Sequence, residues 1–152
     1  MERVVVLGRG GAGKSVLAGR LAAATGLPLV ELDAVFWDPD LRPAPPGEWA
    51  IRQRQLAAGA RWILDGDLGP HDVPRPRLER ADTVVVLDLS AAVCAWRAWR
   101  RSRERAGFWW WLATWRWRSR PALMAAIRQS APDAEVHVLR SRAAVEAFLA
   151  LL

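Results

Sequence analysis

Residues 8–15 read Gly8-Arg9-Gly10-Gly11-Ala12-Gly13-Lys14-Ser15, the most informative motif in the chain. It matches the pattern G-x-x-x-x-G-K-[ST], and Lys14 is the only lysine in the sequence. An ammonium on a flexible stem can fold back over such a loop and reach the phosphates of a nucleotide, where the broad fork of an arginine fits less well. The pattern therefore predicts a nucleotide phosphate site formed by Gly8, Gly10, Gly11, Ala12, Gly13, Lys14, Ser15 and Val16.

The segments on either side of this loop have the patterns of a strand and a helix. Val4-Val5-Val6-Leu7 is a continuous apolar run, typical of a buried parallel strand. After the loop, Leu17 and Leu21 recur at helical spacing up to Gly26, a common C-terminal stop. In this arrangement loop N–H groups and the helix N-terminus surround an anion, and the Ser15 hydroxyl is offered to Mg²⁺. An ordinary glycine-rich turn before a helix is the alternative.

The rest of the chain predicts an α/β fold. Further strands are expected at about 29–32, 62–64, 83–87 and 135–139, with helical patterns between them. Ser90 is expected to cap the long segment that follows residue 90, and Ser141 to cap a closing helix. Strands that alternate with helices form a parallel sheet with helices on both faces. At 152 residues and 52% hydrophobic, residues 1–152 suit one compact domain.

Aspartates follow three of the expected strands: Asp33, Asp65 and Asp88. The carboxyl ends of parallel strands share one edge of the sheet, the edge where ligands bind and where the phosphate loop lies. Asp88 closes an apolar strand in the manner of a Walker B aspartate, so we expect Asp88 and Ser15 to hold Mg²⁺. Helix capping or a solvated turn is the alternative for each aspartate.

These motifs resemble those of the small P-loop kinases related to adenylate kinase and shikimate kinase. Within that group the chain most resembles the bacterial adenylate-kinase-like proteins labelled topology modulation proteins. The resemblance covers nearly the whole chain and rests on residues 8–15, 32–37, 65–67, 77–88 and 139–149. At Asp67 and Leu68 the chain differs from the family, which usually has asparagine and an aromatic residue there.

The resemblance implies a P-loop NTPase three-layer sandwich whose five-stranded parallel sheet has the order 2-3-1-4-5. It also implies ATP and Mg²⁺ as cofactors, and transfer of the γ-phosphoryl group to a small-molecule acceptor, which we expect to be a nucleotide or nucleoside-like. Carried over to this chain, Asp33 would orient the acceptor or the metal's water, and Asp65 would lie near Mg²⁺ or the acceptor. Arginines after the fourth strand would act as a lid over the phosphates.

Basic charge is concentrated in that lid segment. The chain has a net charge of +6, yet residues 97–120 contain eight arginines and one acidic residue, while the remainder has 14 basic and 15 acidic residues. The charge therefore favours one anion-facing segment over a protein coated for DNA. We expect Arg97 and Arg101 to act in catalysis and Arg100 and Arg105 to bind the nucleotide; a solvated basic helix is the alternative.

Residues 108–117 are unusually rich in tryptophan. As a helix, this Trp cluster would be apolar nearly all round, which a solvated lid would not tolerate. Packing onto the protein's own core, self-association or a partner surface, and contact with a membrane surface or nucleic acid all remain open. A different class of function is therefore the alternative to a kinase: an ATP-dependent binding or regulatory module whose Arg/Trp segment engages nucleic acid or a protein.

The remaining features of the sequence mainly exclude classes of protein and kinds of site. The chain runs directly into its first strand with no leader pattern and has no apolar run of spanning length, so a cytoplasmic protein is expected. Cys94 is the only cysteine and cannot form an internal disulfide, and the two histidines are too far apart in sequence to suggest zinc. Guanine selection by an Asn-Lys-x-Asp motif is excluded because the chain has no second lysine.

Overall fold

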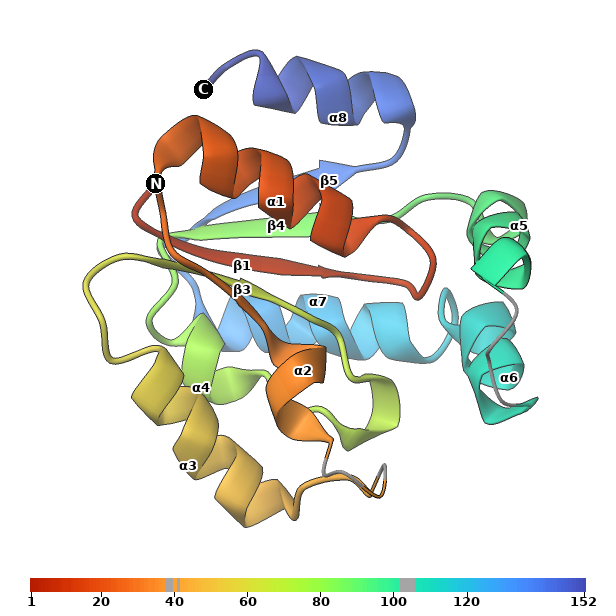
Figure 1. The fold of residues 1–152 in the computed structure, drawn as a ribbon, viewed down its shortest axis with the longest axis horizontal. Helices are drawn as coiled ribbons and strands as arrows, with labels where there is room; N and C mark the ends of the chain where they lie inside the picture. The colour runs from red at the N-terminus through yellow and green to blue at the C-terminus, as the bar shows by residue number, and fades with distance from the viewer. Residues whose placement is uncertain (38–39, 41, 102–105) are drawn as a thin grey trace.

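A five-stranded parallel sheet of order β2-β3-β1-β4-β5 runs through the protein (Figure 1). The computed structural model describes residues 1–37, 40, 42–101 and 106–152. The strands are β1 (Arg3–Gly8), β2 (Leu29–Glu31), β3 (Trp62–Asp65), β4 (Thr83–Leu87) and β5 (Glu135–Leu139). The predicted strands and their order are therefore confirmed.

Helices cover both faces of the sheet, which gives the three layers that the sequence predicts (Figure 1). One face carries α1 (Lys14–Thr25) and α8 (Arg142–Leu149). The other face carries α2 (Leu32–Phe36), α3 (Pro46–Leu56), α4 (Arg75–Leu78) and α7 (Ser119–Ser130). The remaining helices, α5 (Ala91–Arg101) and α6 (Ala106–Thr114), lie beyond the carboxyl ends of the strands, and a 3-10 turn, η1 (Gly69–His71), follows β3.

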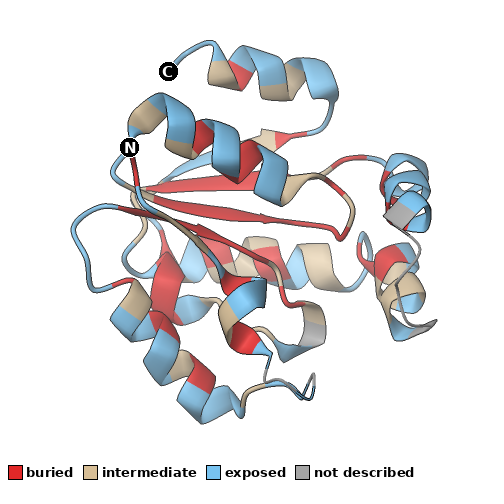
Figure 2. Ribbon diagram, in the orientation of Figure 1, coloured by how far each residue is buried: buried red, intermediate tan, exposed pale blue. Residues whose placement is uncertain are grey.

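Alternate residues of each central strand enter two separate cores. Val4 and Val6 of β1 pack in the same cluster as Leu21 of α1, whereas Val5 packs in the opposite cluster with Trp49 of α3. All five side chains are fully buried; β3 and β4 are buried at every residue, and β1 at every residue after Arg3 (Figure 2). A strand that is buried on both faces must be apolar at every position, which explains the unbroken apolar runs in the sequence.

The two predicted serine caps agree with the structure. The Ser141 hydroxyl accepts a hydrogen bond from the Ala144 N–H (3.1 Å), and Ser90 Oγ accepts one from the Val93 N–H (3.4 Å). Asp33, expected at or just beyond the end of the second strand, lies two residues after β2, in the first turn of α2. An acidic residue is favourable there because the helix dipole is positive at its N-terminus.

The Trp cluster is divided between core and surface. Leu112 and Trp115 are buried, so packing onto the protein's own core, the first of the three alternatives, is observed for these two side chains. Trp110 and Trp117, however, are 65% and 75% exposed. The segment is therefore a cover over the sheet edge with an apolar inner side and a partly apolar outer side.

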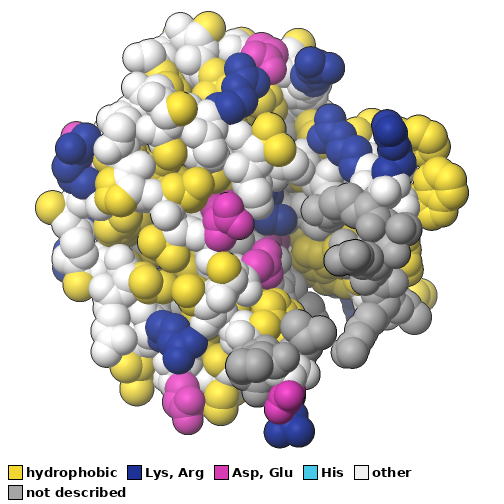
Figure 3. Space-filling model, in the orientation of Figure 1, with side chains coloured by type: hydrophobic (Ala, Val, Ile, Leu, Met, Phe, Trp, Pro, Cys, Tyr) yellow, Lys and Arg dark blue, Asp and Glu magenta, His cyan; other side chains and the backbone are white. Residues whose placement is uncertain are grey.

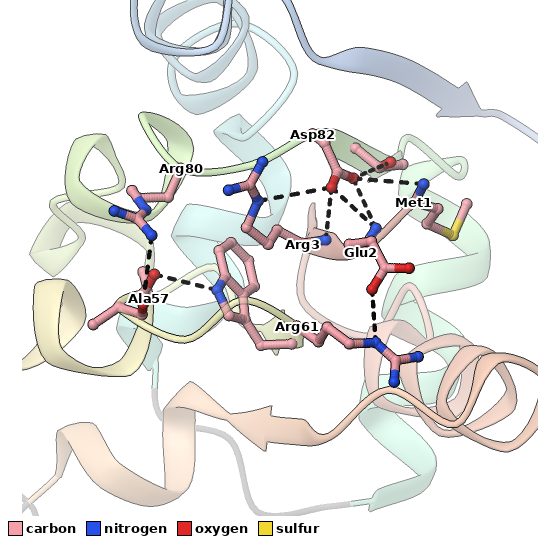
Figure 4. Close-up of polar contacts among 10 residues, drawn as sticks. Met1, Glu2, Arg3, Ala57, Arg61, Arg80 and Asp82 are labelled. Atoms are coloured by element: carbon pink, nitrogen blue, oxygen red, sulfur yellow. Dashed lines mark hydrogen bonds and ion pairs between the residues drawn. The ribbon is translucent and has the colours of Figure 1, made fainter.

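At the amino end of the sheet, Asp82 joins β4 to the start of the chain (Figure 4). Its carboxylate accepts hydrogen bonds from the backbone N–H groups of Glu2 and Arg3 and from the Thr83 hydroxyl at 2.8–3.1 Å. Burial alone would raise the pKa of Asp82, but these hydrogen bonds outweigh it and lower that pKa. The arrangement fixes the N-terminal strand in the centre of the sheet.

Among the helices that the structure describes, none combines the length and the apolar character needed to cross a membrane.

Candidate phosphate-binding site

The loop between β1 and α1 has a backbone that only glycine tolerates at several positions. Gly11 and Gly13 have φ angles of 75° and 94°, in the left-handed region that side chains rarely adopt. Gly10 has no room for a Cβ, which would collide with the ring of Phe108 from α6. The loop is therefore shaped both by its own backbone and by the aromatic segment packed against it.

Lys14 starts α1, and its side chain folds back over the loop. The ammonium Nζ donates to the carbonyl oxygen of Gly8 at 3.0 Å and to that of Arg9 at 3.4 Å. This is the conformation that places a lysine charge beside phosphates held by the loop. Both acceptors are neutral carbonyl groups, so the ammonium keeps its full charge for an anion.

Asp65, at the end of β3, is the carboxylate that meets the loop. Burial raises the pKa of Asp65, and the Ser15 hydroxyl and the Lys14 charge partly oppose this effect. The negative charge of Asp33 raises the same pKa further. Lys14, Ser15 and Asp65 are thus brought together, with Asp33 close enough to interact electrostatically.

This group suits a magnesium ion bound with a nucleotide. Asp65 Oδ1 is buried and has no hydrogen-bond partner among the described residues, which leaves one oxygen of a buried carboxylate for an added ligand. In the part of the chain that the structure describes, no cluster of three or more His, Cys, Asp or Glu side chains could hold a metal by itself. Mg²⁺ needs only one or two carboxylates when phosphates and water complete its shell.

Asp88, which the sequence analysis paired with Ser15, has arginine partners instead. Its Oδ2 accepts a hydrogen bond from Arg120 Nε at 2.8 Å and lies 3.8 Å from Arg140 Nε. This carboxylate ties the start of α7 and the end of β5 to the end of β4. A role for Asp88 in binding Mg²⁺ stays a prediction, and Asp65 is the carboxylate that interacts with Ser15.

The predicted lid arginines have different surroundings. Arg97 Nη1 donates to the carbonyl oxygen of Ala12 at 3.0 Å, so α5 is attached directly to the phosphate loop. The Arg100 guanidinium lies over the exposed Trp96 ring, 5.8 Å from its centroid. The side chain of Arg101 and all of Arg105 lie outside the described residues, so their roles stay predictions.

Val16, also expected at the phosphates, has a side chain that is 70% exposed.

The site also contains residues that were not predicted from the sequence. Trp115 is fully buried, its indole Nε1 donates to Asp67 Oδ2 (3.4 Å), and its ring lies 5.1 Å from the guanidinium carbon of Arg9. Burial raises the pKa of Asp67, while the charge of nearby Lys14 acts to lower it. The sequence shows Arg9 in the loop motif and Asp67 after β3, but only the fold shows that Trp115 contacts both of them.

Charged groups of both signs therefore gather at the carboxyl edge of the sheet. Figure 3 shows acidic side chains near the middle of this face, beside a basic side chain set deeper, where the body of the protein meets the α5 and α6 region. Parallel α/β proteins bind ligands at this edge. The site thus combines the positive charge of Lys14 over the phosphate loop with the nearby carboxylate of Asp65.

Kinases of small molecules are among the solved structures that have a similar fold. A sugar kinase from Janibacter sp. HTCC2649 is 23% identical, with a TM-score of 0.62 over 99% of this chain and 93% of that one. Shikimate kinase from Acinetobacter baumannii, in complex with shikimate, is 16% identical, with a TM-score of 0.66 over 99% and 90%. Deoxyadenosine kinase from M. mycoides, with bound dCTP, is 13% identical, with a TM-score of 0.53 over 97% of each chain.

No family model matches the chain, and no curated protein is significantly similar to it. At these identities the comparisons show the fold alone. The chain has the P-loop kinase fold.

Proposed function

We propose that this protein is an ATP-dependent kinase that transfers the γ-phosphoryl group to a small-molecule acceptor, with a nucleotide or nucleoside-like compound as the expected class. The observation that carries the proposal is the position of Lys14, folded over the phosphate loop and interacting electrostatically with Asp65 and Asp67. A lone ammonium between a phosphate cradle and two carboxyl groups suits transfer of a phosphoryl group. The resemblance to adenylate-kinase-like proteins supports the same reaction class.

Positioning and charge neutralisation supply most of the catalysis in such a reaction. Lys14 would neutralise oxygens of the β- and γ-phosphates, and the loop glycines would let backbone N–H groups approach them. Ser15 and Asp65 would hold Mg²⁺, which when bound neutralises charge on the phosphate oxygens. Arg97 would keep α5 in place over the loop through its bond to Ala12.

Asp33 is the proposed orienting group for the acceptor. It lies in α2, directly after β2, and its charge acts on Asp65. A carboxylate in this place can accept a hydrogen bond from an acceptor hydroxyl and hold it in line with the phosphorus. The similar structures include sugar, shikimate, gluconate and deoxyadenosine kinases, which supports a hydroxylated acceptor.

The test is a phosphoryl-acceptor screen with Mg-ATP, run in parallel on the wild type and on Lys14→Ala. Nucleoside monophosphates, nucleosides and small hydroxylated metabolites form the panel. We expect turnover with one class, and loss of that turnover by about a hundredfold or more in Lys14→Ala, whose fold should be intact by circular dichroism. Arg61→Leu, an exposed arginine paired with Glu2 at the amino end of the sheet, is the matched control and should keep full activity. Unchanged ATP consumption in Lys14→Ala would contradict the proposal.

A binding or regulatory module is the second candidate, and the exposed tryptophans favour it. Trp96 and Trp99 of α5 are 56% and 62% exposed, and Arg100 lies beside them. Tryptophans interleaved with arginines suit contact with bases or with a protein partner. A negative acceptor screen, together with tight ATP binding and nucleic-acid binding that weakens steeply with salt, would favour this candidate.

A further inference from the structure

Arg9 is a buried arginine in the phosphate loop, and its charge is not balanced. Its side chain is 2% exposed, and its Nε is buried without a hydrogen-bond partner. Within the described part of the chain, no residue accepts a hydrogen bond from its guanidinium or forms an ion pair with it. A buried charge without a counter-ion is strongly unfavourable, so this side chain favours the binding of an added anion.

Arg77 is a buried arginine with a structural role, and its surroundings differ from those of Arg9. Its side chain is fully buried, and its terminal nitrogens donate to both carboxylate oxygens of Asp72, at 2.6 and 3.0 Å. They also donate to Gln53 Oε1 and to the carbonyl oxygen of Gly66. Arg77 Nε, like Arg9 Nε, is unpaired, but the charge of Arg77 is neutralised and that of Arg9 is not.

The one favourable contact of the Arg9 guanidinium that we identify among the described residues is the face of Trp115. The guanidinium carbon lies 5.1 Å from the ring centroid. An aromatic face attracts a cation, but it offers no acceptor for the five N–H groups of an arginine. Trp115 therefore holds the side chain in place and leaves its hydrogen-bonding capacity unused.

The position of Arg9 identifies the chemistry of the missing partner. The Lys14 ammonium donates to the carbonyl oxygen of Arg9, so both cations belong to the same few residues of the loop. Asp67 is engaged elsewhere: its Oδ2 accepts from the Trp115 indole N–H at 3.4 Å, and its Oδ1 accepts from the Gly69 N–H at 3.1 Å. An added oxyanion is the partner that would satisfy a planar guanidinium.

We propose that Arg9 is a phosphate-binding residue whose guanidinium pairs with a phosphate oxyanion of the nucleotide held by the loop. The side chain at this position thereby adds a second cation to the charge of Lys14. This inference rests on the proposed nucleotide site and extends it to a side chain within the loop motif. A phosphate group of the acceptor, or free phosphate, has the same chemistry, and the experiment separates these sources from the nucleotide.

The test combines stability and affinity in Arg9→Leu. Removing an unpaired buried charge should stabilise the ligand-free protein, so its urea midpoint should rise. Removing a phosphate contact should weaken Mg-ATP binding by about ten- to a hundredfold in calorimetry. Arg61→Leu controls for the loss of one positive charge and should change neither quantity. Titrations with Mg-ADP and with inorganic phosphate show which phosphate is contacted.

The outcomes are distinct. A loss with both ADP and ATP, or with ATP alone, supports the proposal and assigns the contact to the inner or the terminal phosphate. Mg-ATP affinity within twofold of the wild type overturns it, as does a loss confined to inorganic phosphate. If Arg9→Leu is less stable and also binds weakly, Arg9→Lys decides: partial recovery of affinity supports phosphate binding, and no recovery overturns it.

The same titration separates this inference from the proposed function. Weaker nucleotide binding by Lys14→Ala, with normal binding by Arg9→Leu, would remove the inference and leave the kinase proposal intact. A wild type that binds neither nucleotide nor phosphate would remove both.

Discussion

The two ends of the parallel sheet treat charge in opposite ways. At the amino end, the Asp82 carboxylate receives two backbone N–H groups and a hydroxyl, and its pKa is lowered (Figure 4). At the carboxyl end, burial raises the pKa values of Asp65 and Asp67, and Asp65 Oδ1 and Arg9 Nε have no partner among the described residues.

The difference indicates where the fold gains stability and where it keeps binding capacity. A carboxylate that is fully hydrogen-bonded stabilises the native state, whereas a buried group without partners destabilises it until a ligand arrives. Unsatisfied polar groups at a sheet edge that binds ligands are therefore evidence about the ligand. Here they point to a group with both anionic oxygens and a cation, as Mg-ATP has.

The prediction with the largest expected effect compares two buried arginines. It tests whether an ion pair, and not burial alone, distinguishes an arginine that stabilises the fold from one that binds a ligand. Arg77→Leu should lower the free energy of unfolding by about 3–5 kcal/mol, because it leaves the Asp72 carboxylate and Gln53 without their partner. Urea denaturation measures this loss. Arg9→Leu is the matched comparison with the opposite expected sign, and equal destabilisation of the two variants would break the contrast.

Asp65→Asn should separate function from stability. We expect phosphoryl transfer to fall by about a hundredfold, since the charged partner of Ser15 and the proposed Mg²⁺ ligand is lost. Because the raised pKa of Asp65 means that the ionised form is unfavourable in the fold, the ligand-free variant should be slightly more stable at neutral pH. Steady-state kinetics and urea denaturation on the same sample check the expected loss of activity and the expected gain in stability. A variant that keeps activity would return the metal role to Asp88.

Asp82→Ala should show the behaviour of the amino end. We expect a loss of about 1–3 kcal/mol at pH 7, because the backbone N–H groups of Glu2 and Arg3 lose their acceptor. The folded pKa is lowered, so the contribution of Asp82 is present above the unfolded value of about 3.9 and is lost as the pH falls through the folded value. The difference between variant and wild type should therefore shrink in acid. Asp133→Ala, at an exposed turn, is the control, and a difference that is constant with pH would contradict this assignment.

Much of the fold could be predicted because its signals are local. The strands are continuous apolar runs, and Gly26, Ser90 and Ser141 mark helix ends by their own backbone or side-chain chemistry. The exact bounds of the second strand and of the helix that carries Asp33 could not be predicted, because a three-residue strand followed at once by a five-residue helix is too short to have a clear period. Residues 108–117, which hold five of the ten tryptophans, could not be divided into an inner and an outer side by their period, since this stretch is apolar nearly all round.

The phosphate loop, the strands and their parallel arrangement can be predicted from sequence, because they depend on spacing and on the conformational freedom of glycine. Which aspartate interacts with Ser15 depends on the packing of distant segments, since Asp65 and Asp88 both follow buried strands and differ in what packs beside them. Likewise, the residue type alone does not distinguish Arg9 from Arg77. Contacts between segments far apart in the chain pair one with a carboxylate and leave the other on the face of Trp115.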